Sequence, residues 1–77
     1  MTGIVNRIVS VIFVGKGEGD TITTNDYPKL KIWKRETIPV LRELEKQNYI
    51  KIRYTKHNMH FIVRKPITQT VVNKICC

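Results

Sequence analysis

The sequence predicts a single small α+β domain in which three helices precede a C-terminal β-hairpin. Three observations predict this class. A chain of 77 residues holds one hydrophobic core and no second one. Residues 34–47 repeat apolar side chains at the helical period, and residues 50–64 alternate them as a half-buried strand does. We expect no enzyme, because so small a core leaves little space for a deep pocket and no catalytic set of side chains emerges.

Residues 4–14 carry two conflicting signals. Their apolar side chains recur at i, i+1, i+4, i+5, i+8 and i+9, which indicates a helix. Seven of the eleven residues are Val or Ile, and β-branched side chains favour strands. We expect a helix, because the elements that follow need one. The alternative is a strand that pairs with residues 21–24 across the glycine-rich turn 15–20, which would give a ββαββ arrangement.

The next elements are short. Residues 15–20 contain three glycines and predict a plain loop. Residues 21–23 have the β-branched composition of a short strand. Thr24 or Asn25 would cap a short helix over residues 26–30.

The clearest helix covers residues 34–47, and Val40, Leu41 and Leu44 form its apolar face. A tight connection over residues 31–33 would precede it, with Ile32 and Trp33 pointing into the core. Pro39 fits only if the helix begins near residue 35 or 36, because the missing N–H then belongs to the unpaired first turn. The acids Glu43 and Glu45 would lie on the wet side beside Arg42 and Lys46.

Asn48 is a plausible left-handed end for this helix. Two strands follow, over about residues 50–55 and 59–64, with a turn at residues 56–58 and with Tyr54 and Phe61 on the apolar face. Pro66 ends the second strand. The tail, residues 67–77, has the apolar spacing of a short helix, although a β-branched extension fits nearly as well.

The charge is distributed unevenly along the chain. Fourteen Lys and Arg against six Asp and Glu give a net charge of +8. Residues 1–45 contain seven of the bases and all six acids, a balance of +1, whereas residues 46–77 contain seven bases and no acid. A field this one-sided attracts polyanions and speeds their encounter. No apolar run reaches the ~18 residues that span a bilayer, so we expect no membrane partner.

The order of these elements resembles a winged helix-turn-helix DNA-binding domain. The resemblance covers about residues 4–65 and lies in the capped segment 21–27 and in the helix of residues 34–47. That helix ends in a Leu-x-x-Leu-Glu pattern (Leu41, Leu44, Glu45) before an aliphatic strand. In this family the longer helix enters the major groove and the hairpin, or wing, contacts the backbone or the minor groove. The resemblance therefore implies double-stranded DNA as the partner.

The resemblance also implies which side chains touch DNA. Arg35, near the start of the longer helix, would reach base edges, and Lys34 and Thr37 would join it. Arg42 and Lys46 would contact phosphates. The basic side chains of the hairpin would bind the sugar-phosphate backbone. The complete expected set is Lys34, Arg35, Thr37, Arg42, Lys46, Lys51, Arg53, Lys56, His57, Arg64 and Lys65.

Other ligands are less consistent with the residues. His57 and His60 have a His-x-x-His spacing, and Cys76 and Cys77 end the chain, but the spacing matches no common zinc finger. We therefore expect no metal and no cofactor. Two adjacent cysteines are too few for a disulfide scaffold, which favours a reducing, cytoplasmic location.

The sequence thus predicts a small transcriptional regulator. Residues 1–66 would form the DNA-binding domain, and the tail, with Val71, Val72 and Ile75, would be a dimerisation segment of a homodimer. Two-fold dimers suit palindromic operators. Two alternatives remain open: a protein-interaction module that docks an acidic partner, and a single-stranded DNA or RNA binder built on the ββαββ arrangement.

Overall fold

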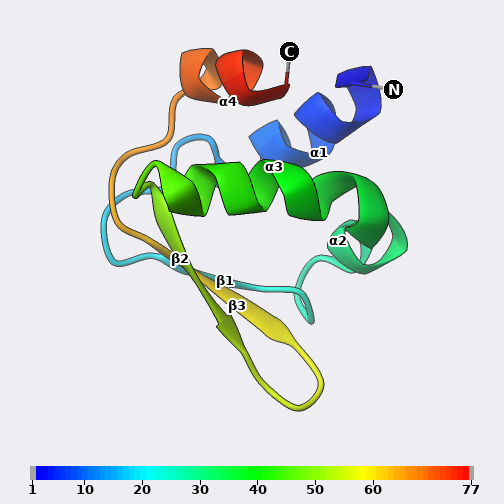
Figure 1. Cartoon of the computed structure of the whole chain (residues 1–77). Helices are drawn as coiled ribbons and strands as arrows, with labels where there is room; N and C mark the ends of the chain where they lie inside the picture. Colours follow the sequence, from blue (N-terminus) through cyan, green and yellow to red (C-terminus); the bar gives the residue numbers. More distant parts are fainter. Residues whose placement is uncertain (1, 77) are drawn as a thin grey trace.

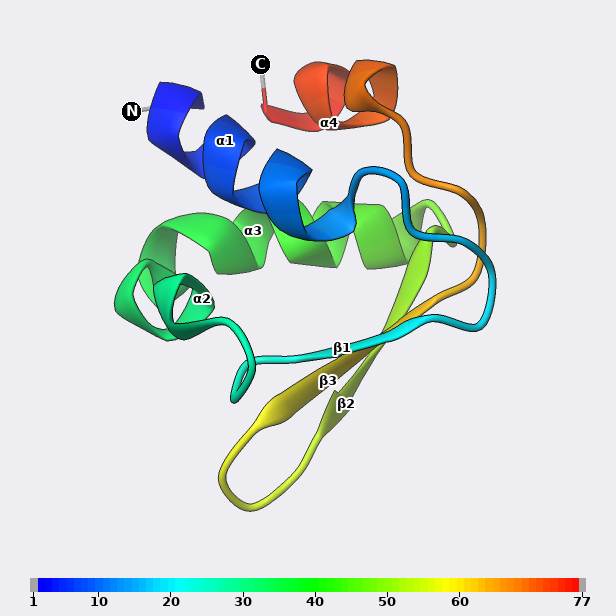
Figure 2. The ribbon, with the colours of Figure 1, turned by 180° about the vertical axis from the view of Figure 1, so that it is seen from behind.

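A computed structural model describes residues 2–76 of the chain (Figures 1 and 2). It is an α+β fold, in which four helices lie on one side of a three-stranded antiparallel sheet (Figure 1). The elements in chain order are α1 (Thr2–Phe13), β1 (Thr21–Thr23), α2 (Pro28–Ile32), α3 (Lys34–Lys46), β2 (Ile50–Tyr54), β3 (Met59–Val63) and α4 (Gln69–Cys76). No helix within these residues is both long enough and apolar enough to cross a membrane.

Helix α1 forms despite its β-branched residues, because its apolar stripe has a core to cover. Val5, Ile8, Val9, Ile12 and Phe13 are all buried. The ring of Phe13 meets the ring of Phe61 in the sheet edge to face, with centroids 5.7 Å apart and planes at 79°. The prediction of a helix over residues 4–14 is confirmed, and the ββαββ alternative is wrong.

The sheet has the order β1-β3-β2, so the hairpin strand β3 lies in the centre. Ile22 of β1 pairs with Phe61 of β3, and Phe61 pairs in turn with Ile52 of β2. All three side chains are buried on the face that packs against the helices. The short strand at residues 21–23 and the hairpin are therefore where the sequence predicts them.

Helix α2 begins two residues later than expected. Its N-cap is Tyr27, which makes no side-chain capping bond, and Pro28 occupies the first turn. Thr24 is instead buried between β1 and the hairpin, where its Oγ1 accepts the backbone N–H of Met59 at 3.1 Å. The expectation that Ile32 points into the core is wrong, since its side chain is 74% exposed at the end of α2.

Helix α3 lies across the sheet and supports the hairpin (Figure 1). It begins at Lys34, so Pro39 lies inside it, beyond the first turn where proline is harmless. Because proline has no N–H, the backbone carbonyl of Arg35 loses its helical partner. Arg35 and Pro39 are both exposed, so water can solvate that carbonyl. Asn48 ends the helix with φ of 66°, and the N–H of Tyr49 reaches back to the carbonyl of Leu44 at 2.9 Å, a Schellman ending.

The tail forms α4 and packs beside α1 and across α3 (Figures 1 and 2). Ile67, Val72 and Cys76 belong to the same buried cluster as the rest of the chain. Residues 67–76 therefore complete the core of the domain, and Val72 is not available as a dimerisation surface. Cys77 lies outside the described residues.

Candidate nucleic-acid interface

The outer side of α3 presents a cationic stripe. Arg35, Pro39, Arg42 and Lys46 recur at i, i+4, i+7 and i+11, and all four are exposed. The opposite side carries the buried residues of the helix, which are Thr37, Leu41 and Leu44. Because burial of that opposite side fixes the rotation of α3, the stripe must face solvent. Lys34 is exposed as well and lies to one side of the stripe, toward the hairpin.

Thr37 is a correction to the expected set. Its side chain is fully buried, and its hydroxyl donates to the carbonyl oxygen of Trp33 at 2.9 Å. The Trp33 carbonyl also accepts the backbone N–H of Thr37 at 2.9 Å, so the side-chain bond mainly gives the buried hydroxyl a partner. A side chain in this position cannot reach DNA, so Thr37 belongs to the core.

Two contacts tie α3 to the first hairpin strand. The carboxylate Oε2 of Glu45 accepts the backbone N–H of Ile52 at 2.9 Å. The guanidinium of Arg42 donates to the Tyr54 hydroxyl at 3.5 Å, at the limit of hydrogen bonding. The sequence predicts Glu45 on the solvent side of α3, beside Arg42 and Lys46. That expectation is wrong, because its carboxylate binds the edge of the sheet. Tyr54 lies on the α3 side of the hairpin as expected, but it is 63% exposed and is not a core residue.

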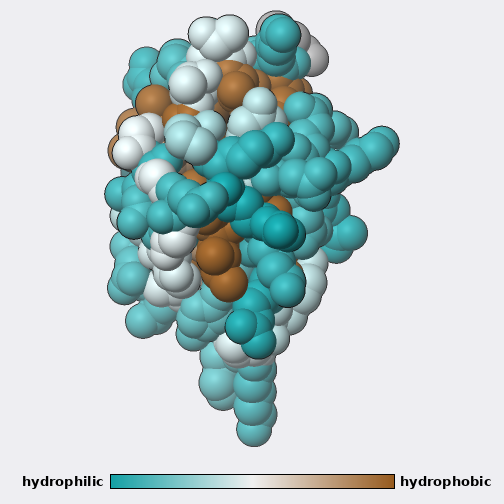
Figure 3. Space-filling view, turned by 90° about the vertical axis from the view of Figure 1, so that its left-hand side faces the viewer, coloured by the Kyte–Doolittle hydropathy of each residue, from teal (hydrophilic) through white to brown (hydrophobic). Residues whose placement is uncertain are grey.

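The hairpin tip carries Lys56 and His57 into solvent. Three bonds between Thr55 and Asn58 close its turn. The N–H and the Oγ1 of Thr55 both donate to the Asn58 carbonyl, at 2.8 and 2.9 Å, and Thr55 Oγ1 accepts the Asn58 N–H at 3.1 Å. In the space-filling view the narrow lower end of the molecule, which the hairpin forms, shows no strongly hydrophobic atoms, whereas such atoms are visible near the top and in the middle of this face (Figure 3). The tip is therefore a well-defined basic projection.

Two further hairpin bases point the other way. Strand side chains alternate between faces, and Ile52 of β2 faces the helices. Lys51 and Arg53 consequently lie on the outer face of the sheet, where Arg53 is paired with His60. The structure therefore does not bring Lys51 and Arg53 together with the stripe on α3.

Arg64 and Lys65 lie at the other end of β3, far along the strand from the tip. Their backbone N–H groups both donate to the carbonyl of Tyr49, at 2.8 and 3.3 Å. The ammonium of Lys65 also sits 4.4 Å from the centroid of the Tyr49 ring, a cation–π contact. These two bases thus lie beside Tyr49, at the connection between α3 and β2.

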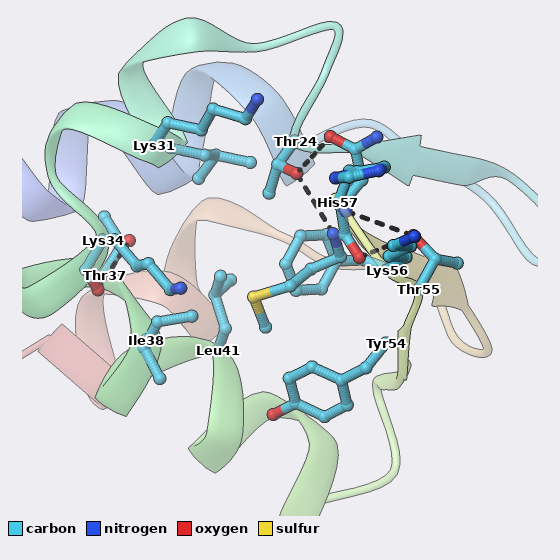
Figure 4. A pocket seen from close by; sticks show the side chains of 14 residues that line it. Thr24, Lys31, Lys34, Thr37, Ile38, Leu41, Tyr54, Thr55, Lys56 and His57 are labelled. Atoms are coloured by element: carbon cyan, nitrogen blue, oxygen red, sulfur yellow. Dashed lines mark hydrogen bonds between the residues drawn. The ribbon is translucent and has the colours of Figure 1, made fainter.

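A cleft separates the hairpin tip from α2 and the start of α3 (Figure 4). Lys31 and Lys34 lie on its helical side, and Lys56 and His57 lie on the side of the tip. Lys31 is not among the residues expected to bind DNA. The sequence carries no signal for it, because Lys31 and Lys34 lie on separate helices, α2 and α3, and only the fold brings both to the cleft. The cleft joins the two basic groups of the interface, the helix and the tip.

Metal binding has no support in the described part of the chain. Across residues 2–76, no three or more His, Cys, Asp or Glu side chains form a group that could hold a metal ion. His57 is at the tip and His60 faces outward from β3, while Cys76 is buried on α4. These side chains therefore come from different parts of the surface and core.

Comparison of the chain with protein-family models, with curated protein sequences and with solved structures gave no match.

Proposed function

We propose that the chain is a winged helix-turn-helix protein that binds double-stranded DNA as a small transcriptional regulator. The order helix, strand, helix, helix and hairpin, with the sheet order β1-β3-β2, supports this assignment. Helices α1 and α2 pack against the longer helix α3, and β1 pairs with β3 of the hairpin, which is the wing.

The observation that carries the proposal is the exposed stripe of Arg35, Arg42 and Lys46 on α3, next to a basic hairpin tip. The major groove of B-DNA is about 12 Å wide and admits a helix. Arg35 lies at the second residue of α3, where an arginine can reach the acceptors of guanine. Arg42 and Lys46, about two and three turns further along, pair with phosphates, and Lys56 binds the backbone beside the groove.

Electrostatics supports the same partner. From residue 46 onward the chain has seven bases and no acid, so the hairpin carries positive charge and no carboxylate of its own. Between the hairpin and α3 lies the carboxylate of Glu45, which accepts the Ile52 N–H. Each phosphate that such a base neutralises releases a counterion, and affinity then falls steeply with salt. Lys51 and Arg53, on the outer sheet face, contribute to the long-range field and not to the contact surface.

The test is equilibrium binding of a fluorescently labelled DNA duplex at increasing salt. We expect binding at low salt and a linear fall of the logarithm of the association constant with the logarithm of salt concentration. A single-stranded DNA of the same length is the matched competitor. If the protein does not bind the duplex even at low salt, DNA binding is excluded. The remaining function is then that of a protein-interaction module, which docks an acidic partner through the same bases.

Pairing of two copies is a separate proposal. A homodimer would place two α3 helices on successive half-sites of a palindromic operator. Because Val72 is buried within the chain, the contact between copies would have to lie elsewhere than on the apolar side of α4. Light scattering at micromolar concentration decides it, and a strict monomer with and without duplex would remove the dimer.

A further inference from the structure

The cleft between the hairpin tip and helices α2 and α3 has a combination of features that DNA contact alone does not require. Its volume is about 190 Å³. Its floor is formed by apolar side chains, of which Ile38 is half-buried and Leu30, Leu41, Met59 and Phe61 are almost fully buried, so the apolar area open to a ligand is small. The rest of the lining is polar. A surface that only follows a sugar-phosphate backbone needs charge and no such apolar floor.

The rim of the cleft is cationic on both sides. Figure 4 shows Lys31 and Lys34 on the helical side, with Lys56 and His57 across the opening. No Asp or Glu lines the cleft. An anionic group placed between the two sides would meet positive charge from α3 and from the hairpin together, and it would do so next to apolar surface, where water competes less for each contact.

The walls are held in place by the fold. Thr24 Oγ1 accepts the N–H of Met59 at 3.1 Å and lies 3.4 Å from the Asn58 side-chain oxygen. The N–H of Thr24 donates to the Met59 carbonyl at 3.1 Å. These bonds fix the tip side of the cleft to the end of β1, so a ligand does not have to order that wall, and less binding energy is lost on entry.

We propose that this cleft binds a small organic anion, with a phosphate or carboxylate head group on the lysine rim and a single ring or short chain on the apolar floor. The size supports this class, since drug-sized ligands occupy pockets of roughly 300–1,000 Å³ and this one is smaller. The bound anion neutralises Lys34 and also Lys56, which contacts DNA in the proposed function, so the ligand weakens DNA binding. This regulatory effect rests on the proposed function, whereas the binding of the anion does not.

The experiment is a titration of the ¹⁵N-labelled full chain, in the absence of DNA, with phenyl phosphate. Two matched probes accompany it: phenol, which has the ring without the charge, and inorganic phosphate, which has the charge without the ring. We expect saturable shifts of the amides of Leu41, Asn58 and Met59, and an affinity for phenyl phosphate at least about tenfold above that for either probe, because both halves of the site must be filled. Equal affinities for phenyl phosphate and inorganic phosphate would overturn the proposal and leave a plain phosphate contact, such as one with the DNA backbone.

Variants locate the site. Lys34→Gln removes one exposed cation from the rim, and we expect an affinity for phenyl phosphate about tenfold lower, since a charge-assisted bond is lost. Lys74→Gln removes an equally exposed charge from α4, and we expect no change. Similar losses in both variants would overturn the site, because only net charge would then matter.

A second arm measures duplex affinity with and without saturating phenyl phosphate. We expect weaker duplex binding with the ligand, and by reciprocity a weaker affinity for the ligand with duplex present. Unchanged duplex affinity would overturn the regulatory effect alone. If the duplex does not bind at all, the proposed function fails while the ligand titration still stands or falls by itself.

Discussion

The carboxylate of Glu45 on α3 accepts the backbone N–H of Ile52 on β2 at 2.9 Å. Because β2 is an edge strand of the sheet, its outward N–H groups have no neighbouring strand to pair with. The side chain of the helix takes the place of that strand. This bond fixes the hairpin against α3, and with it the distance between the basic stripe and the basic tip.

Replacement of Glu45 by alanine should destabilise the fold. The bond joins a charged acceptor to a backbone donor, and such bonds contribute about 1.5–3 kcal/mol. We expect the free energy of unfolding, measured by urea denaturation, to fall by about that amount. Glu43→Ala is the matched control, because Glu43 is on the same helix and its carboxylate accepts an exposed hydrogen bond from the Gln47 side chain. For this variant we expect the free energy of unfolding to fall by less than about 0.5 kcal/mol. Equal losses would mean that the Glu45 bond does not hold the hairpin.

Thr37→Val tests the reassignment of Thr37 from the interface to the core. Valine keeps the shape of the side chain and removes the hydroxyl that donates to Trp33. The carbonyl of Trp33 retains the N–H of Thr37 at 2.9 Å as a partner, so we expect a loss of only about 1 kcal/mol in unfolding free energy. Duplex affinity should not change. A large loss of DNA binding in a fully folded variant would restore Thr37 to the interface.

Arg35→Ala and Lys56→Ala should affect DNA binding in different ways. Arg35 is placed to contact base edges, so its loss should reduce the preference for the selected sequence, at a cost of about 1–3 kcal/mol on that sequence. Lys56 is placed on a phosphate, so its loss should weaken all duplexes alike and reduce the salt slope by about 1. Binding curves for a selected and a scrambled duplex at several salt concentrations separate the two. The same effect of both variants on every sequence counts against α3 as the recognition helix.

Val72→Ala tests whether α4 belongs to the core of one chain. The substitution removes two buried methyl groups, and we expect a loss of about 2 kcal/mol from transfer and cavity terms together. Urea denaturation at two protein concentrations, tenfold apart, is the measurement. If the loss arises within one chain, the midpoint does not depend on concentration. A midpoint that rises with concentration in the native chain, and ceases to do so in the variant, would place Val72 between two copies.

Much of this fold follows from sequence pattern. Helix α3, the Asn48 ending and the hairpin register all come from residues whose local preference and burial agree. At residues 4–14 the two disagree, and the helix prevails because its stripe buries five apolar side chains in a core shared with α3, α4 and Phe61 of the sheet. The free-energy preference of these residues for a strand is small compared with the free energy gained by burying the five side chains.

The rest depended on tertiary contacts that spacing does not encode. Ile32 reads as a core residue, but the turn of α2 directs it outward. Thr24 reads as a helix cap, but its hydroxyl pairs with Met59, 35 residues away. Lys51 and Lys56 look alike in the sequence, and only the pleat and the closed tip place them on different surfaces. For the same reason the cleft, which joins residues of α2, α3 and the hairpin, has no signature in any one segment.

The most direct test of the central claim is to map the DNA-contacting surface by titrating the ¹⁵N-labelled chain with a short duplex at low salt. We expect the largest amide shifts along the outer side of α3, at Arg35 and Arg42, and at the hairpin tip around Lys56, with small shifts at Lys51 and Arg53. Shifts concentrated on the outer face of the sheet or on α1 and α4, with α3 unaffected, would contradict it.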